Sequence, residues 1–510
     1  MEKIIKKKIL LLDGLIKKVE AFKRKGKIIV QSHGIFDLIH PGVIKHLNSA
    51  KEQGHILVVS VIKDKDVRRG PGRPIFPDYM RAENVASLSQ VDYVCVVDDE
   101  KPFECIERIK PDIFARGHSL KDSDTEIGQK ILAEEKGLYL GKVKIHDTDG
   151  FSLSSTEIIK NFLNIYPSEI KSFLKRFSQK YSFNEIVQRI NHLNKLKILL
   201  IGEGIIDEYH YCDSMGKSAK APLVVNKYVT HEVFAGGTFA IANHLAGICD
   251  NVHLVSLLGN EASREDYIRS NIKPNVTNKF FYRADGTTIV KKRYIEQYLN
   301  QKLFEVNYLN NNYINSELES EIIRYLKATI TAYDFVLVSD FGHGMMTNKI
   351  IEIIQRMAKR FAVNTQMNAA NAGYNMINKY HSPTFVCLDE QELRWAAQDR
   401  FSEVECVAKK VLKNIKADTL IVTLGKKGSL GINKKNQINR TPVFSSKVVD
   451  TVGAGDAFFS FTAPGIASNM PLDLVSFIGN AVGAIAVQIV CNKRPVEKYE
   501  LLEFIHALLR

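Results

Sequence analysis

The chain has 510 residues, of which 45% are hydrophobic and 25% are charged. That length predicts two or more domains, and that composition excludes a collagen-like, disulfide-stapled or largely disordered chain. Lys and Arg outnumber Asp and Glu by 70 to 57, a formal net charge of +13. Spread over the whole chain, this surplus is a weak signal. We interpret the lysine-rich N-terminal segments as solvated helix faces rather than a nucleic-acid-binding arm, because no zinc-finger spacing or RNA-binding aromatic pattern accompanies them.

Seven cysteines are scattered along the chain, and no two of them form a C-x-x-C pair. We therefore predict neither a disulfide framework nor a zinc site, and we expect a reducing, cytoplasmic compartment. The longest apolar run, at 477–491, contains Asn480 and Gln488 and is too short to span a bilayer. It is interpreted as a buried helix, so no membrane partner is expected.

The first part of the chain alternates strand-like and helix-like runs. Five apolar or β-branched runs are typical of buried strands: 27–34, 55–62, 91–98, 112–117 and 138–146. An amphipathic run at 41–54 ends in a glycine, as helices do. The alternation predicts a doubly wound parallel sheet. The segment 68–78 is rich in Gly, Pro and Arg and is predicted to be a mobile or extended loop.

From residue 156 to about 196 no strand-like run occurs, and the pattern predicts two or three helices broken at Pro167 and near Ser182. A second alternation then begins, with these strand-like runs: 197–209, 251–259, 333–342, 360–365, 384–390 and 419–425. The predicted fold class is therefore α/β, with two doubly wound parallel-sheet domains. We place a Rossmann-like domain at 1–160, a helical linker at 161–195 and a second α/β domain at 196–510.

The segment "HGIFDLIHPGV" at 33–43 follows the first predicted strand and opens a helix. Its glycine lets a ligand approach the backbone, while His40 and the first helix amides face an anion. A histidine at a helix start often serves only the turn, and "SST" at 154–156 could be a simple helix cap. In combination, these segments resemble the cytidylyltransferase-like nucleotidyltransferases, whose motifs are G-x-F-D-x-x-H-x-G-H and S-S-T. The resemblance covers about residues 25–160.

This resemblance implies nucleotidyl transfer from ATP or CTP to a phosphate or sugar phosphate, with Mg²⁺ present and pyrophosphate released. It implies a catalytic role for His40. It assigns nucleotide binding to Gly34, Phe36, Asp37, Gly42, Arg69, Arg81, Ser154, Ser155 and Thr156. The second histidine of the motif is replaced by Val43, which cannot donate a hydrogen bond to the phosphate. We therefore expect nucleotide binding with slow or absent transfer; the alternative is a degenerate nucleotide-binding or scaffolding module.

The segment "DTVGAGDAFFSF" at 450–461 places small residues at the start of a helix. The amides of Gly453, Ala454 and Gly455 can form an anion hole for a phosphate group. Asp456 follows directly, and a carboxylate is badly placed beside phosphate unless it has a chemical task. Accepting the proton of an attacking hydroxyl is such a task. On its own, a glycine-rich turn could serve only to begin the helix.

This segment is similar to that of the pfkB, or ribokinase-like, sugar kinases, in which the aspartate is the general base. Five further segments resemble the family in the same order: 202–211, 234–247, 339–344, 389–392 and 423–428. The resemblance implies substrate contacts by Asp207, Gly236, Gly237 and Asn243. It implies nucleotide and Mg²⁺ contacts by Asp389, Glu392, Thr423, Gly425 and Gly428, with no metal site made by protein ligands alone.

Within these kinases, the segments 202–225 and 287–295 resemble the bifunctional heptose-7-phosphate kinase/heptose-1-phosphate adenylyltransferases, in which the kinase domain comes first. Here the order is inverted, and 362–375 lacks the acidic D-P-K-like strand end. The resemblance implies ATP-dependent phosphorylation of a sugar or sugar phosphate, followed by nucleotidyl transfer to a sugar 1-phosphate. Small-molecule sugar phosphates and nucleoside triphosphates are the expected partners, without nucleic acid. The sugar and the oligomeric state stay open, a homodimer being the arrangement considered.

Overall fold

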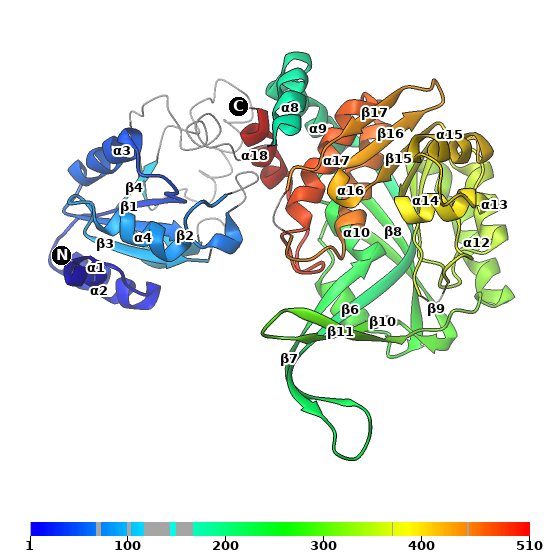
Figure 1. Cartoon of the computed structure of the whole chain (residues 1–510), viewed down its shortest axis with the longest axis horizontal. Helices are drawn as coiled ribbons and strands as arrows, with labels where there is room; N and C mark the ends of the chain where they lie inside the picture. The colour runs from blue at the N-terminus through cyan, green and yellow to red at the C-terminus, as the bar shows by residue number, and fades with distance from the viewer. Residues whose placement is uncertain are drawn as a thin grey trace. The chain divides into compact units, whose positions relative to one another are not determined.

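The computed structural model describes residues 2–67, 73–98, 104–116, 143–148, 167–369, 371–445 and 448–509. The chain divides into two compact units, which are considered separately (Figure 1). The N-terminal unit consists of Met1–Asn184 together with Leu502–Arg510, and the C-terminal unit of Glu185–Leu501. No helix in these described ranges is long and apolar enough to cross a membrane.

The N-terminal unit contains a parallel sheet in the strand order β3-β2-β1-β4-β5. Its strands are β1 (Ile29–Gly34), β2 (Ile56–Ile62), β3 (Tyr93–Val97), β4 (Ile113–Arg116) and β5 (Lys144–Asp147). Its helices include α1 (Glu2–Lys8), α2 (Leu12–Arg24), α3 (Pro41–Glu52), α4 (Asp78–Ala86), α5 (Glu104–Ile109) and α8 (Ser168–Lys180). The five predicted strands are confirmed; residues 138–142 of the last one, and 68–72 of the predicted loop, lie outside the described ranges.

Helices cover both faces of this sheet, because its strands carry apolar side chains on both faces. Val30 and Leu57 pack with α3 and α4 on one face. Ile29 and Val58 pack with α2 and α5 on the other. The sheet is therefore doubly wound, as predicted, and its strand order reverses between β1 and β4. In such sheets, ligands bind outside the carboxyl ends of the strands at this point.

The C-terminal unit is built on a larger, mainly parallel sheet in the order β6-β12-β13-β14-β15-β16-β17, with β8 and β9 on the other side of β6. Its body strands are β8 (Asn251–Glu261), β9 (Val276–Thr287), β12 (Phe335–Asp340), β13 (Phe361–Thr365), β14 (Phe385–Asp389), β15 (Thr419–Thr423), β16 (Ser429–Asn433) and β17 (Ile438–Thr441). Each strand-like run predicted after residue 196 lies in one of the strands of this unit, which confirms the second α/β fold.

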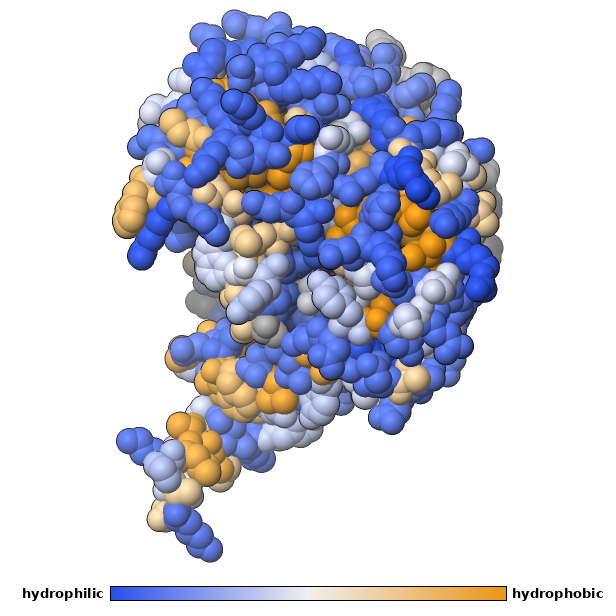
Figure 2. Space-filling view, turned by 90° about the vertical axis from the view of Figure 1, so that its right-hand side faces the viewer, coloured by the Kyte–Doolittle hydropathy of each residue, from blue (hydrophilic) through white to orange (hydrophobic). Residues whose placement is uncertain are grey.

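The strand β6 (Lys197–Lys217) extends far beyond the body of the sheet (Figure 1). Its second half pairs with β7 (Val224–Gly237) and β10 (Ile289–Glu296), and β10 pairs with β11 (Gln301–Tyr308). We call the second half of β6, together with β7, β10 and β11, the lid sheet. Its projecting hairpin carries exposed apolar residues, including Met215 and Val224, and Figure 2 shows apolar surface on this part.

Helices flank the body sheet on both faces. They are α9 (Phe183–His192), α10 (Thr238–Leu245), α11 (Glu265–Ser270), α12 (Ser316–Thr329), α13 (Asn348–Met357), α14 (Glu390–Ala397), α15 (Val404–Asn414), α16 (Ala454–Ala467) and α17 (Leu472–Ala486). The last helix, α18 (Lys498–Leu509), begins in this unit, and its residues from Leu502 on are assigned to the N-terminal unit. The helix α17 is almost entirely buried, as predicted from its apolar run. The predicted break near Ser182 is confirmed, because α8 ends at Lys180 and α9 begins at Phe183. The helix α8 begins directly after Pro167, and the residues before Pro167 lie outside the described ranges.

Candidate functional site

A cavity of about 260 Å³ lies at the carboxyl ends of the parallel strands of the C-terminal unit, and strands β6 and β10 of the lid sheet contribute to its wall. This is the edge of an α/β sheet where ligands bind. Many of the residues predicted for a kinase site line it: Asp207, Gly237, Asp389, Glu392, Thr423, Gly453, Gly455 and Asp456. They come from five segments spread over about half the chain, so the fold, and not sequence proximity, brings them together.

The turn before α16 fits the predicted anion hole. Gly453 has a φ of +85°, and a Cβ atom there would lie 2.1 Å from Oδ1 of Asn492, so only glycine fits. Gly455 stands in the first helical turn, and a Cβ atom on it would meet nothing within 4 Å. The first amides of a helix have no intrahelical partner. A phosphate group in the cavity can therefore approach these amides closely, although the Ala454 side chain does not line the cavity.

Asp456 lies in the first turn of α16, and its side chain is buried. Burial raises the pKa of its carboxyl to about 7, and the nearby charge of Asp207 adds to this rise. Gln366 Nε2 donates a hydrogen bond of 2.5 Å to its Oδ1, which favours the ionised form. A carboxylate with a pKa near neutrality can accept a proton from a hydroxyl group and release it again.

Asp207 is held in place by the lid sheet. Arg293 on β10 donates to Asp207 Oδ1 at 2.5 Å and pairs with Glu305 on β11 at 2.7 Å. A Cβ atom on Gly236 would lie 2.0 Å from Asp207 Oδ2, so glycine is required there for the carboxylate to occupy its place. Gly236 therefore acts by leaving space rather than by lining the cavity.

Lys291 lines the cavity, although no sequence motif pointed to it. It pairs in register with Asp207, and it lies two residues from Arg293, so both side chains point to the same face of β10. The intervening Lys292 points the other way, to Glu208 at 3.3 Å. Within the described ranges, no hydrogen bond or ion pair joins Lys291 to another residue, and burial lowers the pKa of its ammonium group. It is a cation facing the cavity.

Asp389 and Glu392 begin α14 as a reciprocal pair of helix caps. The amide of Glu392 donates to Asp389 Oδ1 at 2.7 Å, and the amide of Asp389 donates to Glu392 Oε2 at 2.9 Å. Burial and the charge of Asp389 raise the pKa of Glu392 to about 8. Two carboxyl groups that repel each other at a cavity wall fit a divalent cation with oxygen ligands, such as Mg²⁺ shared with nucleotide phosphates.

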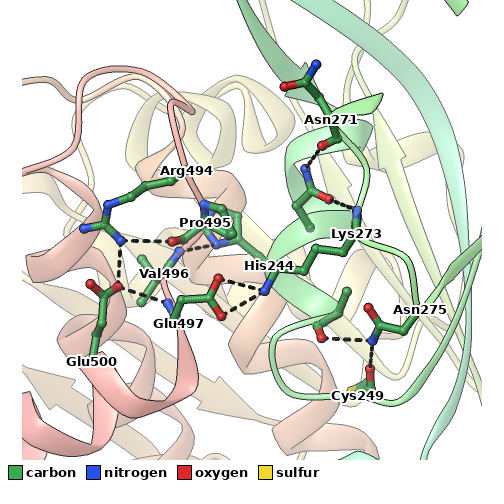
Figure 3. Close-up of polar contacts among 12 residues, drawn as sticks. His244, Cys249, Asn271, Lys273, Asn275, Arg494, Pro495, Val496, Glu497 and Glu500 are labelled. Atoms are coloured by element: carbon green, nitrogen blue, oxygen red, sulfur yellow. Dashed lines mark hydrogen bonds and ion pairs between the residues drawn. The ribbon is translucent and has the colours of Figure 1, made fainter. Parts of the chain in front are cut away.

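Three other predicted residues do not reach this cavity. Asn243 donates to the carbonyl of Asn271 at 2.8 Å and accepts from the amide of Lys273 at 2.9 Å. Figure 3 shows the polar network around these two partners. Because these backbone contacts hold Asn243 away from the cavity, its assignment to substrate is corrected to a structural role. Gly425 and Gly428 shape the turn after β15, with φ values of +55° and +84°.

At the N-terminal site, His40 caps α3 and accepts a hydrogen bond from the amide of Gly42 at 3.2 Å. Burial lowers its pKa, so the imidazole is neutral at pH 7. Gly34 ends β1, and Phe36 follows with a φ of +51°. Val43 packs against the hydrophobic core beside α3. Arg69, Ser154, Ser155 and Thr156 lie outside the described residues.

The structure corrects the assignment of Arg81 as a phosphate contact. Its side chain is fully buried, and its guanidinium group donates to the carbonyls of Phe76, Ile35 and Ile62 and pairs with Asp64 at 2.7 Å. These contacts clasp the ends of β1 and β2 and use most of its five donors. The guanidinium is thus committed to holding the sheet.

Asp37 also differs from its predicted role in nucleotide binding. Its buried carboxylate accepts from the amides of Ile75 and Phe76 and pairs with Arg73 at 2.6 Å. Every one of these partners belongs to the segment that leads into α4. The assignment of Asp37 is therefore corrected to an anchor for this segment.

Replacing Arg81 by Met should lower the free energy of unfolding of the N-terminal unit by at least about 3 kcal/mol, since three buried carbonyls lose a partner at about 1–3 kcal/mol each. Urea unfolding of the full chain, followed by a probe in this unit, measures the change. Arg24→Met, at an exposed position on α2, is the matched control and should change little. Unchanged stability with lost nucleotide binding would restore the phosphate-contact assignment.

Each of the two units matches a known protein family. The family description "pfkB family carbohydrate kinase" matches residues 195–492, and "Cytidylyltransferase-like" matches residues 32–161. The order of the two domains along the chain is therefore the predicted one. The "Bifunctional protein HldE" of Syntrophotalea carbinolica is 36% identical over 162 residues, which cover 31% of this chain and 32% of that protein.

The protein of the same name from Trichlorobacter lovleyi is 24% identical over 296 residues, or 57% of this chain and 59% of that protein. The chain thus spans less than two thirds of the length of these curated relatives. Among solved structures, phosphofructokinase-2 from Escherichia coli with substrates and products is similar with a TM-score of 0.51 and 15% identity. That similarity covers 62% of this chain and 100% of the kinase, and it shows the fold. Because the kinase family matches more than half of its length, the chain belongs to the pfkB family of carbohydrate kinases.

Proposed function

We propose that the chain is a bifunctional enzyme of sugar-nucleotide synthesis. Its C-terminal unit phosphorylates a hydroxyl group of a sugar phosphate with ATP, and its N-terminal unit transfers a nucleotidyl group to a sugar 1-phosphate. The observation that carries the kinase proposal is Asp456: a buried carboxyl with a pKa of about 7, beside the amides of a helix start, facing a cavity. Those are the parts that phosphoryl transfer to an alcohol requires.

In this proposal Asp207 accepts a hydrogen bond from the acceptor sugar and orients it. Asp456 takes the proton of the attacking hydroxyl, while the amides of Gly453 and Gly455 stabilise negative charge on the transferred phosphoryl group. Asp389 and Glu392 would hold Mg²⁺ together with the nucleotide. The metal supplies neutralisation of the phosphate charges.

The proposed acceptor carries a phosphate of its own, because Lys291 lines the cavity and makes no hydrogen bond or ion pair with the described residues. The nearby carboxylates of Asp207, Glu305 and Asp456 attract its charge without contacting it. Such a cation is stabilised when an anion binds. Arg293 does not supply this charge, since it is already paired with Asp207 and Glu305. By resemblance to the heptose kinases, we propose heptose 7-phosphate as the sugar.

Lys291→Met should raise the KM for the sugar phosphate about tenfold to a hundredfold, as expected for one lost charge-assisted hydrogen bond. The KM for the same sugar without its phosphate should hardly change. Steady-state assays with both acceptors measure this difference. Lys292→Met is the matched control, because that side chain contacts Glu208 on the opposite face of the strand. Equal losses with both acceptors would instead assign Lys291 to the nucleotide phosphates.

For the N-terminal unit we propose nucleotide binding by the loops after β1, with His40 directed at the phosphates and ATP or CTP as the donor. Because Val43 offers no hydrogen bond, transfer by this unit is proposed to be slow. The alternative is a degenerate nucleotide-binding or scaffolding module, as Arg81 and Asp37 are engaged in structural contacts.

With this function we propose domain boundaries at residues 160 and 195. We also propose a cytoplasmic location and a homodimer. The location is supported by the seven cysteines, which are free thiols, as in proteins of reducing compartments.

A further inference from the structure

The carboxylate of Asp450 connects the lid sheet to the anion-hole turn. Asp450 Oδ1 accepts from Lys302 Nζ at 2.7 Å and from the amide of Val452 at 3.1 Å. Its Oδ2 accepts from the hydroxyl of Tyr209 at 2.7 Å and from the amide of Cys491 at 3.1 Å. The residue is only 7% exposed. One buried side chain therefore has four partners from four segments.

Two of these partners belong to the lid sheet, and two belong to the body. Tyr209 lies on β6 and Lys302 on β11. Val452 lines the cavity and directly precedes Gly453. Cys491 directly precedes Asn492, whose side chain lies so close to Gly453 that it leaves no room for a Cβ atom there. The two body amides thus flank the glycine that shapes the anion hole.

Apolar packing follows the same path. Tyr209, Phe234 and Ile295 of the lid sheet form a buried cluster with Cys491, and Val452 packs against it. The rings of Tyr209 and Phe234 meet edge to face with centroids 5.3 Å apart. Lys302 Nζ lies 5.4 Å from the centroid of the Tyr209 ring. Lid and turn are therefore joined by packing as well as by hydrogen bonds.

The lid sheet also supplies a positive charge that compensates the negative charge of Asp450. An ionised carboxylate beside a phosphate-binding turn repels the phosphate unless a cation compensates it. Burial alone would raise the pKa of Asp450, but the hydrogen bonds from Lys302 and Tyr209 hold it below its usual value. Lys302 is the cation in this contact, and it arrives on the lid strand β11.

We propose that Asp450, Lys302 and Tyr209 form a latch, by which docking of the lid sheet sets the anion-hole turn in its phosphate-binding geometry. This inference rests on the kinase activity proposed above. Asp450 and Lys302 act as positioning residues: they hold the amides of the turn and cancel a charge, and they do not touch the reacting atoms.

The first test is a double-mutant cycle on the full chain. Lys302→Met should lower kcat by about tenfold to a hundredfold, the range for coupled neighbouring groups, with smaller changes in KM. In an Asp450→Asn background, the same substitution should cost little more, because the charge to be cancelled is gone. Lys434→Met, an exposed ion pair with Asp418, is the matched control. Independent, multiplicative losses in the double variant would overturn the latch.

Chemical rescue and amide hydrogen exchange distinguish the latch from a simple loss of packing. They also show whether the latch exists when the proposed kinase reaction does not. Ethylammonium should partly restore kcat in Lys302→Ala, because it supplies the missing cation. Amide hydrogen exchange at Val452 and Cys491 should speed up in Tyr209→Phe, which removes one hydroxyl and keeps the ring. Faster exchange without any sugar kinase activity would retain the latch and reject the proposed reaction. Unchanged exchange and no rescue would reject the latch.

Discussion

Asp456→Asn is expected to lower the kinase kcat by about 10²–10⁴-fold, the usual cost of losing a general base. The amide has the shape of the carboxyl group and can keep a hydrogen bond to Gln366, but it cannot accept the proton of the acceptor hydroxyl. The fold and the affinity for ATP should stay nearly unchanged. Steady-state kinetics and nucleotide titration of the purified variant measure both. Asp266→Asn, in the exposed first turn of α11, is the control.

The pH dependence of kcat tests the role of Asp456 independently. Because burial raises the pKa of Asp456 to about 7, the carboxylate is ionised above that pH and protonated below it. The proton acceptor is the ionised form, so kcat should fall about tenfold per pH unit as the pH drops below 7. This inflection should vanish from the residual rate of Asp456→Asn. A near wild-type rate in that variant would remove Asp456 from the mechanism.

Val43→His is expected to raise the rate of nucleotidyl transfer about 10²–10³-fold, the usual effect of one preorganised donor at a transition state. Val43 lies three residues after His40, at the place where the family motif has its second histidine. Pyrophosphate release with ATP or CTP and a sugar 1-phosphate measures the change. Ile44→His, exposed on the neighbouring face of α3, is the control and should not raise the rate.

Rapid transfer by the unmodified chain would contradict this expectation. His46 is poorly suited to replace the missing donor, because its two ring nitrogens lie 2.7 Å from the hydroxyls of Ser32 and Thr148. Burial and His146 lower its pKa to about 4, so it is neutral at pH 7. No transfer by either form would favour the scaffolding alternative for the N-terminal unit.

The sequence predicted β8 and β12 to β15 of the body sheet, because strands buried on both faces are continuous apolar runs, but it did not predict β9, β16 or β17. It did not predict β11, in which every residue is exposed. It also did not show how far β6 continues into the lid sheet. The strand β11 forms a hairpin with β10, and the second half of β6 pairs with β7 and with the more distant β10. Such pairing stabilises a strand without giving it a continuous apolar run.

At the kinase site, the sequence motif located Gly453, whose positive φ and close neighbour favour glycine, and Asp456, which lines the cavity. Sequence motifs failed where the role depends on a distant partner. In the sequence Arg81 has no obvious partner, because the carbonyl group of Ile35 that it contacts lies 46 positions away along the chain. Lys291 is one of three consecutive cations, and only the register of β10 with β6 shows which of them faces the cavity.

The most direct measurement is the product of the kinase reaction itself. The full chain, with ATP and Mg²⁺, is incubated with a panel of heptose, hexose and pentose phosphates and their unphosphorylated sugars, and product masses are recorded. We expect one or more sugar phosphates to gain a single phosphoryl group, and Asp456→Asn to abolish this gain. Phosphorylation that proceeds equally in that variant, or ATP consumption with no phosphorylated sugar in the panel, would contradict it.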